Sequence, residues 1–165
     1  ETSRHEKPLS FPFAHNPEAG FGAVAEDGST IFVQRTPGMM SETEVEGVIQ
    51  HQKEEVQRRI KVLRNNRPLP EIKGKCVILV DDGIAMGSTM RAALKLCRNL
   101  QAEKIIVASP VSGPDTAMDF SRMADEAVIL EQPLNFRAVA QVYENWYDVS
   151  DEEVLNFIHN YAESK

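Results

Sequence analysis

The sequence predicts an α/β fold with a doubly wound, mainly parallel sheet, helices on both faces and a β-hairpin near the N-terminus. Beyond residue 75, apolar runs of strand length alternate with segments of helical periodicity, which is the order typical of a parallel sheet. These runs are continuous rather than alternating, as in strands buried on both faces. Because no repeat or change of composition divides the 165 residues, we expect a single domain over residues 1–165.

The hairpin is predicted where two short apolar runs, 21–25 and 30–34, flank the dipeptide Asp27-Gly28. Asp-Gly between apolar runs is typical of a tight turn, because glycine adopts the positive φ that such turns require. We therefore expect two short antiparallel strands in this part of the chain.

Two helices are marked by a capping box, in which Ser at the N-cap is followed three residues later by Glu. Ser41 and Glu44 open a helix predicted over residues 42–64, and Ser150 with Glu153 opens the last helix. The remaining elements follow from apolar runs, helical spacing and a proline at a first helical position. They are a strand over 76–80, a helix over 87–100, a strand over 104–111, a short helix from Pro114 and a strand over 127–130. The last helix extends to about residue 162.

Composition excludes several classes of function. The net charge of -7 argues against a partner that is nucleic acid, and no apolar run approaches the roughly 18 residues that span a membrane. The N-terminal residues lack a signal-peptide pattern, and two cysteines in a chain of this size suit a reducing compartment, so we expect a cytoplasmic protein. Cys76 and Cys97 are interpreted as small core residues. The four histidines share no metal-ligand spacing.

One loop carries the strongest chemical signal. The predicted strand 76–80 runs directly into the acidic pair Asp81-Asp82, and Gly87-Ser88-Thr89 opens the next helix. Two carboxylates can accept hydrogen bonds from vicinal hydroxyls, while a helix N-terminus with a glycine offers N–H groups to a phosphate. Because the carboxylates repel a bare polyanion, we expect the ligand to arrive with a divalent cation such as Mg²⁺.

Two other interpretations of this loop compete with a ligand site. The acidic pair could be a solvated strand end, although the placement of Gly, Ser and Thr disfavours that interpretation. Receiver domains of two-component signalling also carry an acidic pair, but theirs ends the first strand and the acceptor aspartate ends a later one. Here the pair follows a hairpin and a long helix, and Asp125 precedes its strand.

Residues 77–89 resemble the binding motif for 5-phosphoribosyl 1-pyrophosphate in the type I phosphoribosyltransferase family. The segments 16–28 and 136–146 are also similar to an uncharacterised phosphoribosyltransferase-like branch of that family. The resemblance implies a phosphoribosyltransferase-like fold and a Mg²⁺-dependent transfer of a 5-phosphoribosyl group from phosphoribosyl pyrophosphate to a nitrogen base. The resemblance also implies that pyrophosphate is the leaving group and that the reaction belongs to nucleotide metabolism.

The resemblance also implies roles for particular residues. The catalytic pair Asp81 and Asp82 would hold the ribose 2- and 3-hydroxyls, with Mg²⁺ bridging these oxygens and the pyrophosphate. The backbone N–H groups of residues 85–89 would hold the 5-phosphate. An aromatic residue after the last strand could stack on the base, although core packing remains an alternative for it. The implied substrate-binding residues are Asp81, Asp82, Gly83, Ile84, Ala85, Met86, Gly87, Ser88, Thr89 and Phe136.

Three features depart from the family pattern. Met86 replaces a frequent threonine, so one phosphate-facing hydroxyl is missing, and Ala85 replaces an aspartate of the branch that acts on 6-oxopurines. A hypoxanthine or guanine substrate is therefore not expected. Family members also begin with a strand and a pyrophosphate loop upstream of the part that matches 16–28. We find no such strand in 1–15, so we expect the chain to lack them.

The sequence therefore favours a phosphoribosyltransferase whose acceptor base is not specified. The alternative is a non-catalytic sensor that binds a phosphoribosyl compound and regulates a partner, because one fold serves both roles. The charged face of the helix over 42–64 is interpreted as solvated surface or as the interface of a homodimer.

Overall fold

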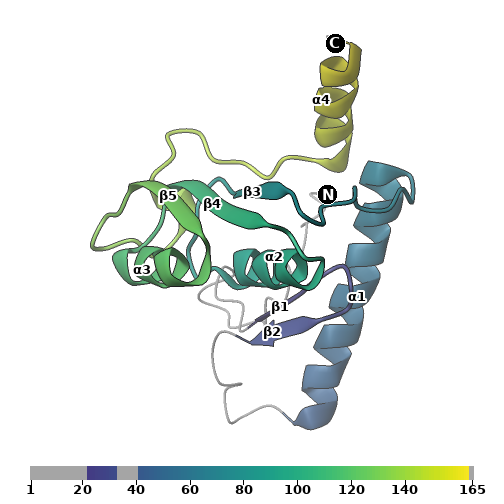
Figure 1. Ribbon diagram of the computed structural model, residues 1–165, viewed down its shortest axis with the longest axis horizontal. Helices are drawn as coiled ribbons and strands as arrows, with labels where there is room; N and C mark the ends of the chain where they lie inside the picture. The colour runs from purple at the N-terminus through teal and green to yellow at the C-terminus, as the bar shows by residue number, and fades with distance from the viewer. Residues whose placement is uncertain (1–21, 33–40, 164–165) are drawn as a thin grey trace.

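The structure is a computed structural model that describes residues 22–32 and 41–163. Within these residues the chain forms an antiparallel strand pair, a three-stranded parallel sheet, four α-helices and one short 3₁₀ helix (Figure 1). The strands are β1 (Gly22–Val24), β2 (Thr30–Phe32), β3 (Cys76–Val80), β4 (Lys104–Val111) and β5 (Glu126–Glu131). The helices are α1 (Glu42–Arg64), α2 (Ser88–Asn99), α3 (Pro114–Met123), η1 (Val139–Gln141) and α4 (Asp151–Glu163).

The parallel sheet confirms the predicted α/β class. Its strands are ordered β3-β4-β5, and the register pairs Val80 with Ala108 and Ala108 with Val128. Helices α2 and α3 pack against one face, where alternate side chains of the strands point inward. The buried core on this face contains Ile84, Met90, Leu94, Cys97, Ile105, Val107 and Phe120.

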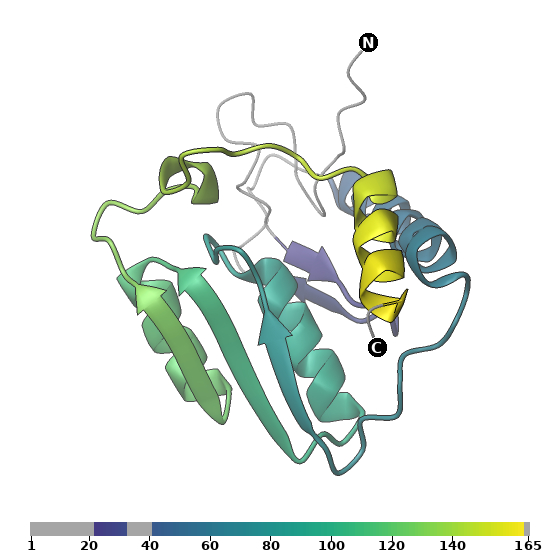
Figure 2. The ribbon, with the colours of Figure 1, turned by 90° about the horizontal axis from the view of Figure 1, so that it is seen from above.

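The opposite face of the sheet differs from the sequence prediction, which expected helices over both faces. Figure 2 shows the strands from this side, with α2 and α3 behind them. Apolar side chains on this face are exposed, including Val80 at 74% and Leu130 at 73%. Both faces of the strands are apolar, as the continuous apolar runs predicted. Among the described residues, however, helices pack on only one of the two faces.

The two cysteines differ in burial because the outer face of the sheet is exposed. Cys97 is buried on the inner side of α2, as predicted, but Cys76 is exposed. The expectation for Cys76 was wrong because its side chain belongs to the same outer face of β3 as Ile78 and Val80, given that side chains alternate along a strand.

The predicted hairpin is confirmed. Strands β1 and β2 pair antiparallel with Ala23 opposite Ile31, and the turn places Gly28 at φ 80°. Helices α1 and α2 both contact this hairpin. A second small core of Ala23, Ala25 and Ala92 fills the contact, where small side chains let the elements approach closely.

Both predicted capping boxes are present. Ser41 Oγ accepts a hydrogen bond from the N–H of Glu44 at 3.3 Å, and the N–H of Ser41 donates to the Glu44 carboxylate at 2.8 Å. The same exchange joins Ser150 and Glu153 at the start of α4, at 3.2 Å and 2.8 Å. Each box satisfies N–H groups that a helix leaves free at its first turn.

Helix α4 lies beside α1, which brings the last element close to the end of β3 (Figure 2). None of the helices in the described ranges combines the length and the apolar character needed to cross a membrane. The predicted absence of a strand in residues 1–15 falls outside the described residues.

Candidate functional site

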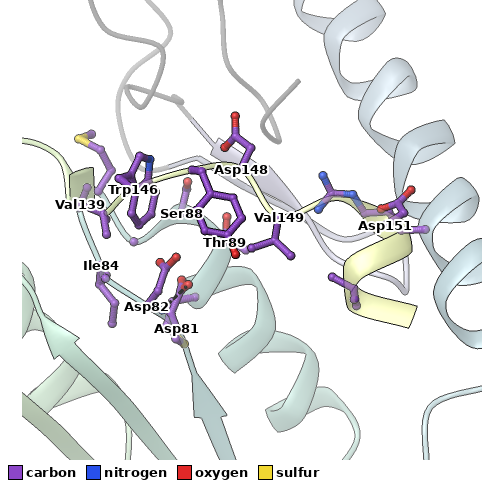
Figure 3. A pocket seen from close by; sticks show the side chains of 18 of the residues that line it. Asp81, Asp82, Ile84, Ser88, Thr89, Val139, Trp146, Asp148, Val149 and Asp151 are labelled. Atoms are coloured by element: carbon purple, nitrogen blue, oxygen red, sulfur yellow. Dashed lines mark hydrogen bonds between the residues drawn. The ribbon is translucent and has the colours of Figure 1, made fainter. Parts of the chain in front are cut away.

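A cavity of about 480 Å³ opens where β3 ends, between the loop that follows this strand, helix α1 and the segment leading into α4 (Figure 3). The carboxyl end of a parallel strand is the usual position of a ligand in such folds. The residues that line it are Arg59, Leu63, Asp81, Asp82, Gly83, Ile84, Ala85, Met86, Gly87, Ser88, Thr89, Met90, Val139, Trp146, Tyr147, Asp148, Val149, Asp151 and Val154. All nine predicted positions from 81 to 89 are among them.

The acidic pair forms part of the cavity wall. The N–H of Asp81 still donates to Ala108 O at 3.2 Å, so sheet pairing fixes the backbone where the pair begins. Both carboxylates point toward the side where Ser88 and Thr89 lie (Figure 3). Asp81 is half-buried and accepts a hydrogen bond from the N–H of Asp82 at 3.0 Å, whereas Asp82 is exposed.

Burial changes the acidity of one member of the pair. Desolvation raises the pKa of Asp81 from 3.8 to about 6, and the negative charge of Asp82 acts in the same direction. A ligand that donates hydrogen bonds to this carboxyl would stabilise its ionised form, which burial disfavours. The position therefore suits a hydroxyl-bearing ligand.

The loop after the pair is held close to the core. The N–H of Ile84 donates to Val111 O at 2.9 Å, and the Ile84 side chain is buried. At Gly83, an added Cβ would lie 2.5 Å from Val139 Cγ1, so only glycine allows this approach. Gly87 has φ 73°, and an added Cβ there would lie 2.7 Å from a ring carbon of Phe120.

Helix α2 begins directly at this loop with Gly87 as N-cap and no side-chain cap. The N–H groups of a first helical turn lack partners within the helix, and the helix dipole adds a partial positive charge. Ser88 and Thr89 add hydroxyl groups at the same point. Backbone N–H groups, dipole and hydroxyls together suit a phosphate.

In the part of the chain that the structure describes, the charged groups in the rest of the cavity wall are two aspartates and one arginine, among mostly apolar and aromatic side chains. Asp148 and Asp151 join the acidic pair, and Arg59 is the single Lys or Arg among the described residues that line the cavity. Arg59 forms an ion pair with Glu55 at 2.8 Å. Asp151 forms an ion pair with Arg58 at 2.6 Å, so the carboxylates of the cavity wall that lack such a pairing within residues 22–32 and 41–163 are those of the acidic pair and Asp148, which favour a cation beside a polyanionic ligand.

Carboxylate oxygens are the donors that Mg²⁺ prefers, so Asp81 and Asp82 fit the expected cation in their chemistry. Among residues 22–32 and 41–163, no group of three or more His, Cys, Asp or Glu side chains is arranged to hold a metal ion by itself. The residues therefore fit a Mg²⁺ ion whose other ligands come from the bound substrate and water.

The aromatic wall comes from the segment between β5 and α4. Trp146 and Tyr147 line the cavity, whereas Phe136 does not, and its ring lies 3.9 Å from the position of a Cβ on Gly113. Tyr143 anchors this segment, because its hydroxyl donates to Asp82 O at 2.6 Å. The Tyr143 and Trp146 rings lie 5.4 Å apart between centroids.

The sequence predicted the contiguous loop 81–89, but not the parts of the cavity wall that come from segments far away in the sequence. Arg59, Asp148 and Asp151 had no local signal, because the packing of α1 against α4 and the path of the chain before α4 bring them to the loop. Trp146 and Phe136 both follow the last strand, and spacing alone did not indicate which of these aromatic side chains lines the cavity.

Three comparisons with known proteins agree with one another. A family model described as "Phosphoribosyl transferase domain" matches residues 33–144. Two Mycobacterium tuberculosis proteins, from strains CDC 1551 and H37Rv and both named "Putative phosphoribosyl transferase", are 36% identical over 154 residues. The match covers 91% of this chain but 34% of each relative, so the chain spans about a third of their length.

A solved structure, that of the protein TT1426 from Thermus thermophilus, is similar in fold. The two superimpose with a TM-score of 0.67 at 30% sequence identity. The match covers 93% of this chain and 73% of that one.

Proposed function

Because the chain belongs to the phosphoribosyl transferase domain family, we propose that its cavity binds phosphoribosyl pyrophosphate and transfers the 5-phosphoribosyl group to a nitrogen base. The observation that carries the proposal is the placement of two carboxylates and a helix N-terminus around one cavity. The pair recognises vicinal hydroxyls and the N-terminus recognises a phosphate, so both ends of a ribose 5-phosphate find complementary groups.

In this mechanism Asp81 and Asp82 accept hydrogen bonds from the ribose 2- and 3-hydroxyls. The N–H groups of residues 85–89 and the hydroxyls of Ser88 and Thr89 hold the 5-phosphate. This fixes the sugar with its anomeric carbon toward the open part of the cavity, and positioning of this kind supplies much of the rate enhancement.

Transfer proceeds by displacement. The C–O bond between the anomeric carbon and pyrophosphate breaks, pyrophosphate leaves with the electron pair, and a nitrogen lone pair of the base forms the new C–N bond. Positive charge develops on the sugar ring in between, and the carboxylates of Asp81 and Asp82, which would hold the adjacent hydroxyls, would stabilise it. Asp81 and Asp82 would hold Mg²⁺, which would neutralise the charge of the leaving pyrophosphate.

The acceptor base is assigned to the wall formed by Trp146 and Tyr147. An indole face offers stacking to any planar heterocycle. Ala85 offers no side-chain group to a base nitrogen, which is consistent with an acceptor other than a 6-oxopurine. Tyr143 holds the wall by its hydrogen bond to Asp82 O.

Thermal unfolding in the presence of phosphoribosyl pyrophosphate and Mg²⁺ tests binding. A ligand at about 100 times its Kd stabilises the native state by about 2.7 kcal/mol, which is a rise of several degrees in Tm. No rise at millimolar ligand contradicts the proposal.

The double variant Asp81→Asn, Asp82→Asn is the matched control, since it keeps the shape of both side chains. We expect it to abolish the rise in Tm. A full response from this variant would show that the carboxylates do not hold the ligand.

Release of pyrophosphate in the presence of a panel of nitrogen bases tests turnover. One base that supports release identifies the acceptor class. Binding without release from any base would favour the alternative function, a sensor that responds to a phosphoribosyl compound.

A further inference from the structure

We infer that the hydroxyls of Ser112 and Thr116 are positioning groups, which turn the backbone of the phosphate loop so that its N–H groups face the cavity. The phosphate loop is defined here as residues 83–89. The inference rests on the proposed function, because it concerns how the same loop is prepared to hold a phosphate.

Both hydroxyls bond to carbonyl groups of the loop. Ser112 Oγ donates to Ile84 O at 2.9 Å, and Thr116 Oγ1 donates to Ala85 O at 3.1 Å. Ser112 is completely buried and follows β4, while Thr116 is half-buried in the first turn of α3. Two consecutive carbonyl groups of the loop are thus bonded from the side of α3.

Because the peptide bond is planar, the direction of each carbonyl group fixes the direction of the N–H group that follows it. In a trans peptide the N–H points opposite to the C=O of the preceding residue, and no cis peptide occurs in the described residues. The Ala85 N–H therefore points away from Ser112, and the Met86 N–H points away from Thr116.

The residues that line the cavity indicate on which side of the loop it lies. Ala85 and Met86 both line the cavity, whereas Ser112 and Thr116 do not. The two hydroxyls therefore bond to the carbonyl oxygens on the side away from the ligand and leave the N–H groups directed toward it.

Rotation of either peptide would reverse this arrangement. A carbonyl oxygen would then face the cavity and repel the phosphate, in a wall that already contains four carboxylates. The backbone of Ile84 is fixed on its N–H side by Val111 O at 2.9 Å, so the next rotatable peptides are the two that the hydroxyls hold. Preorganised N–H groups bind an anion without the free-energy cost of reorganisation.

Calorimetric titration with ribose 5-phosphate in the presence of Mg²⁺ tests the inference. Thr116→Val has nearly the same shape and lacks the donor, and we expect about tenfold weaker binding, as for loss of one hydrogen bond. Thr116→Ser keeps the hydroxyl and should restore most of the affinity. Ser112→Ala should weaken binding by a similar factor through the neighbouring carbonyl.

Ser121→Ala is the matched control. Ser121 also lies on α3, and its Oγ donates to Ala117 O at 3.0 Å, within the same helix rather than to the phosphate loop. This variant should bind ribose 5-phosphate as the unmodified chain does. Urea unfolding of every variant separates a change in binding from a change in stability.

The outcomes distinguish this inference from the proposed function. If the unmodified chain does not bind ribose 5-phosphate, both are overturned. If it binds and Thr116→Val binds equally well, only the positioning role is wrong. If Thr116→Ser is as weak as Thr116→Val, the methyl group rather than the hydroxyl matters, and the inference is also overturned.

Discussion

At the scale of single residues, Asp81 links the chemistry of the site to the stability of the fold. Burial raises its pKa from 3.8 to about 6, so the folded chain holds this proton more tightly than the unfolded chain does. Between these two pH values the folded state binds more protons, and its stability falls as the pH rises. The carboxyl is half ionised at about pH 6 and almost fully ionised about one pH unit higher, so the destabilising charge is present at neutral pH at the position where the proposed hydroxyl ligands would bind.

We predict that Asp81→Asn increases the free energy of unfolding of the ligand-free protein at pH 7.5 by about 1 kcal/mol, because it removes a partly desolvated charge. The gain should shrink as the pH falls through 6 and vanish near pH 4. Urea unfolding at several pH values measures this difference. Asp82→Asn, at an exposed position, should give a smaller gain, and a gain from Asp81→Asn that does not depend on pH would contradict the assignment.

Gly87 is required for two independent reasons, its positive φ and the nearby Phe120 ring. We predict that Gly87→Ala lowers the free energy of unfolding by about 2 to 3 kcal/mol and abolishes ribose 5-phosphate binding. Gly47→Ala is the control, since an added Cβ at this exposed position in α1 has no atom within 4 Å. It should stabilise the protein by about 0.5 to 1 kcal/mol, and equal effects of the two substitutions would refute the argument.

At the scale of elements, the segment between β5 and α4 depends on few anchors. Tyr143→Phe removes the 2.6 Å hydrogen bond to Asp82 O while the ring remains. Because Trp146 follows this anchor, we predict an increase in KM for the acceptor base, by about five- to tenfold, with little change in KM for phosphoribosyl pyrophosphate. Tyr161→Phe, on an exposed part of α4, is the control; a parallel rise in both KM values after Tyr143→Phe would show a general disturbance.

The capping box of α4 makes a separate prediction. Ser150→Ala removes the acceptor for the N–H of Glu153 and should cost about 1 kcal/mol in the first turn of the helix. Hydrogen exchange should become faster at the first amides of α4 and remain unchanged in α1. Ser41→Ala should give the reverse pattern, because it removes the equivalent cap of α1.

The elements were predictable where their signals are local. Capping boxes, the Asp27-Gly28 turn and Pro114 at the start of α3 act through neighbours in sequence, and each is present in the structure. Helix η1 was not predicted. Its position depends on Val139 packing against Gly83, a contact between distant parts of the chain that no local pattern encodes.

At the scale of the whole molecule, the difference between local signals and distant contacts explains which parts of the site could be predicted from the sequence. The positions from 81 to 89 were predicted because a strand end, a turn and a helix start are consecutive. Trp146 and Asp148 reach the cavity only through the path of the chain after β5, and Arg59 only through the packing of α1. The outer face of the sheet was predicted as covered because an apolar strand has the same composition whether or not another element packs on it.

The exposed face gives the last prediction. Val80 and Leu130 already contact solvent, so Val80→Thr and Leu130→Thr should change the free energy of unfolding by less than about 0.5 kcal/mol. Val107→Ala, at a fully buried position of the same sheet, should cost about 2 kcal/mol. Binding of a hydrophobic dye should fall in the two threonine variants and not in Val107→Ala. A large loss of stability from either threonine variant would contradict the exposure of this face.

The bond from Tyr143 to the backbone of Asp82 joins two parts of the chain with different duties. In the proposed mechanism, the part that binds sugar and phosphate is the continuous segment 81–89 beside the core, and the part that binds the acceptor comes later in the chain and is tethered to it. On that mechanism, substitutions confined to the tethered segment would change which heterocycle is accepted and leave sugar-phosphate binding intact. Substitutions in the continuous segment would instead lower turnover with every acceptor alike.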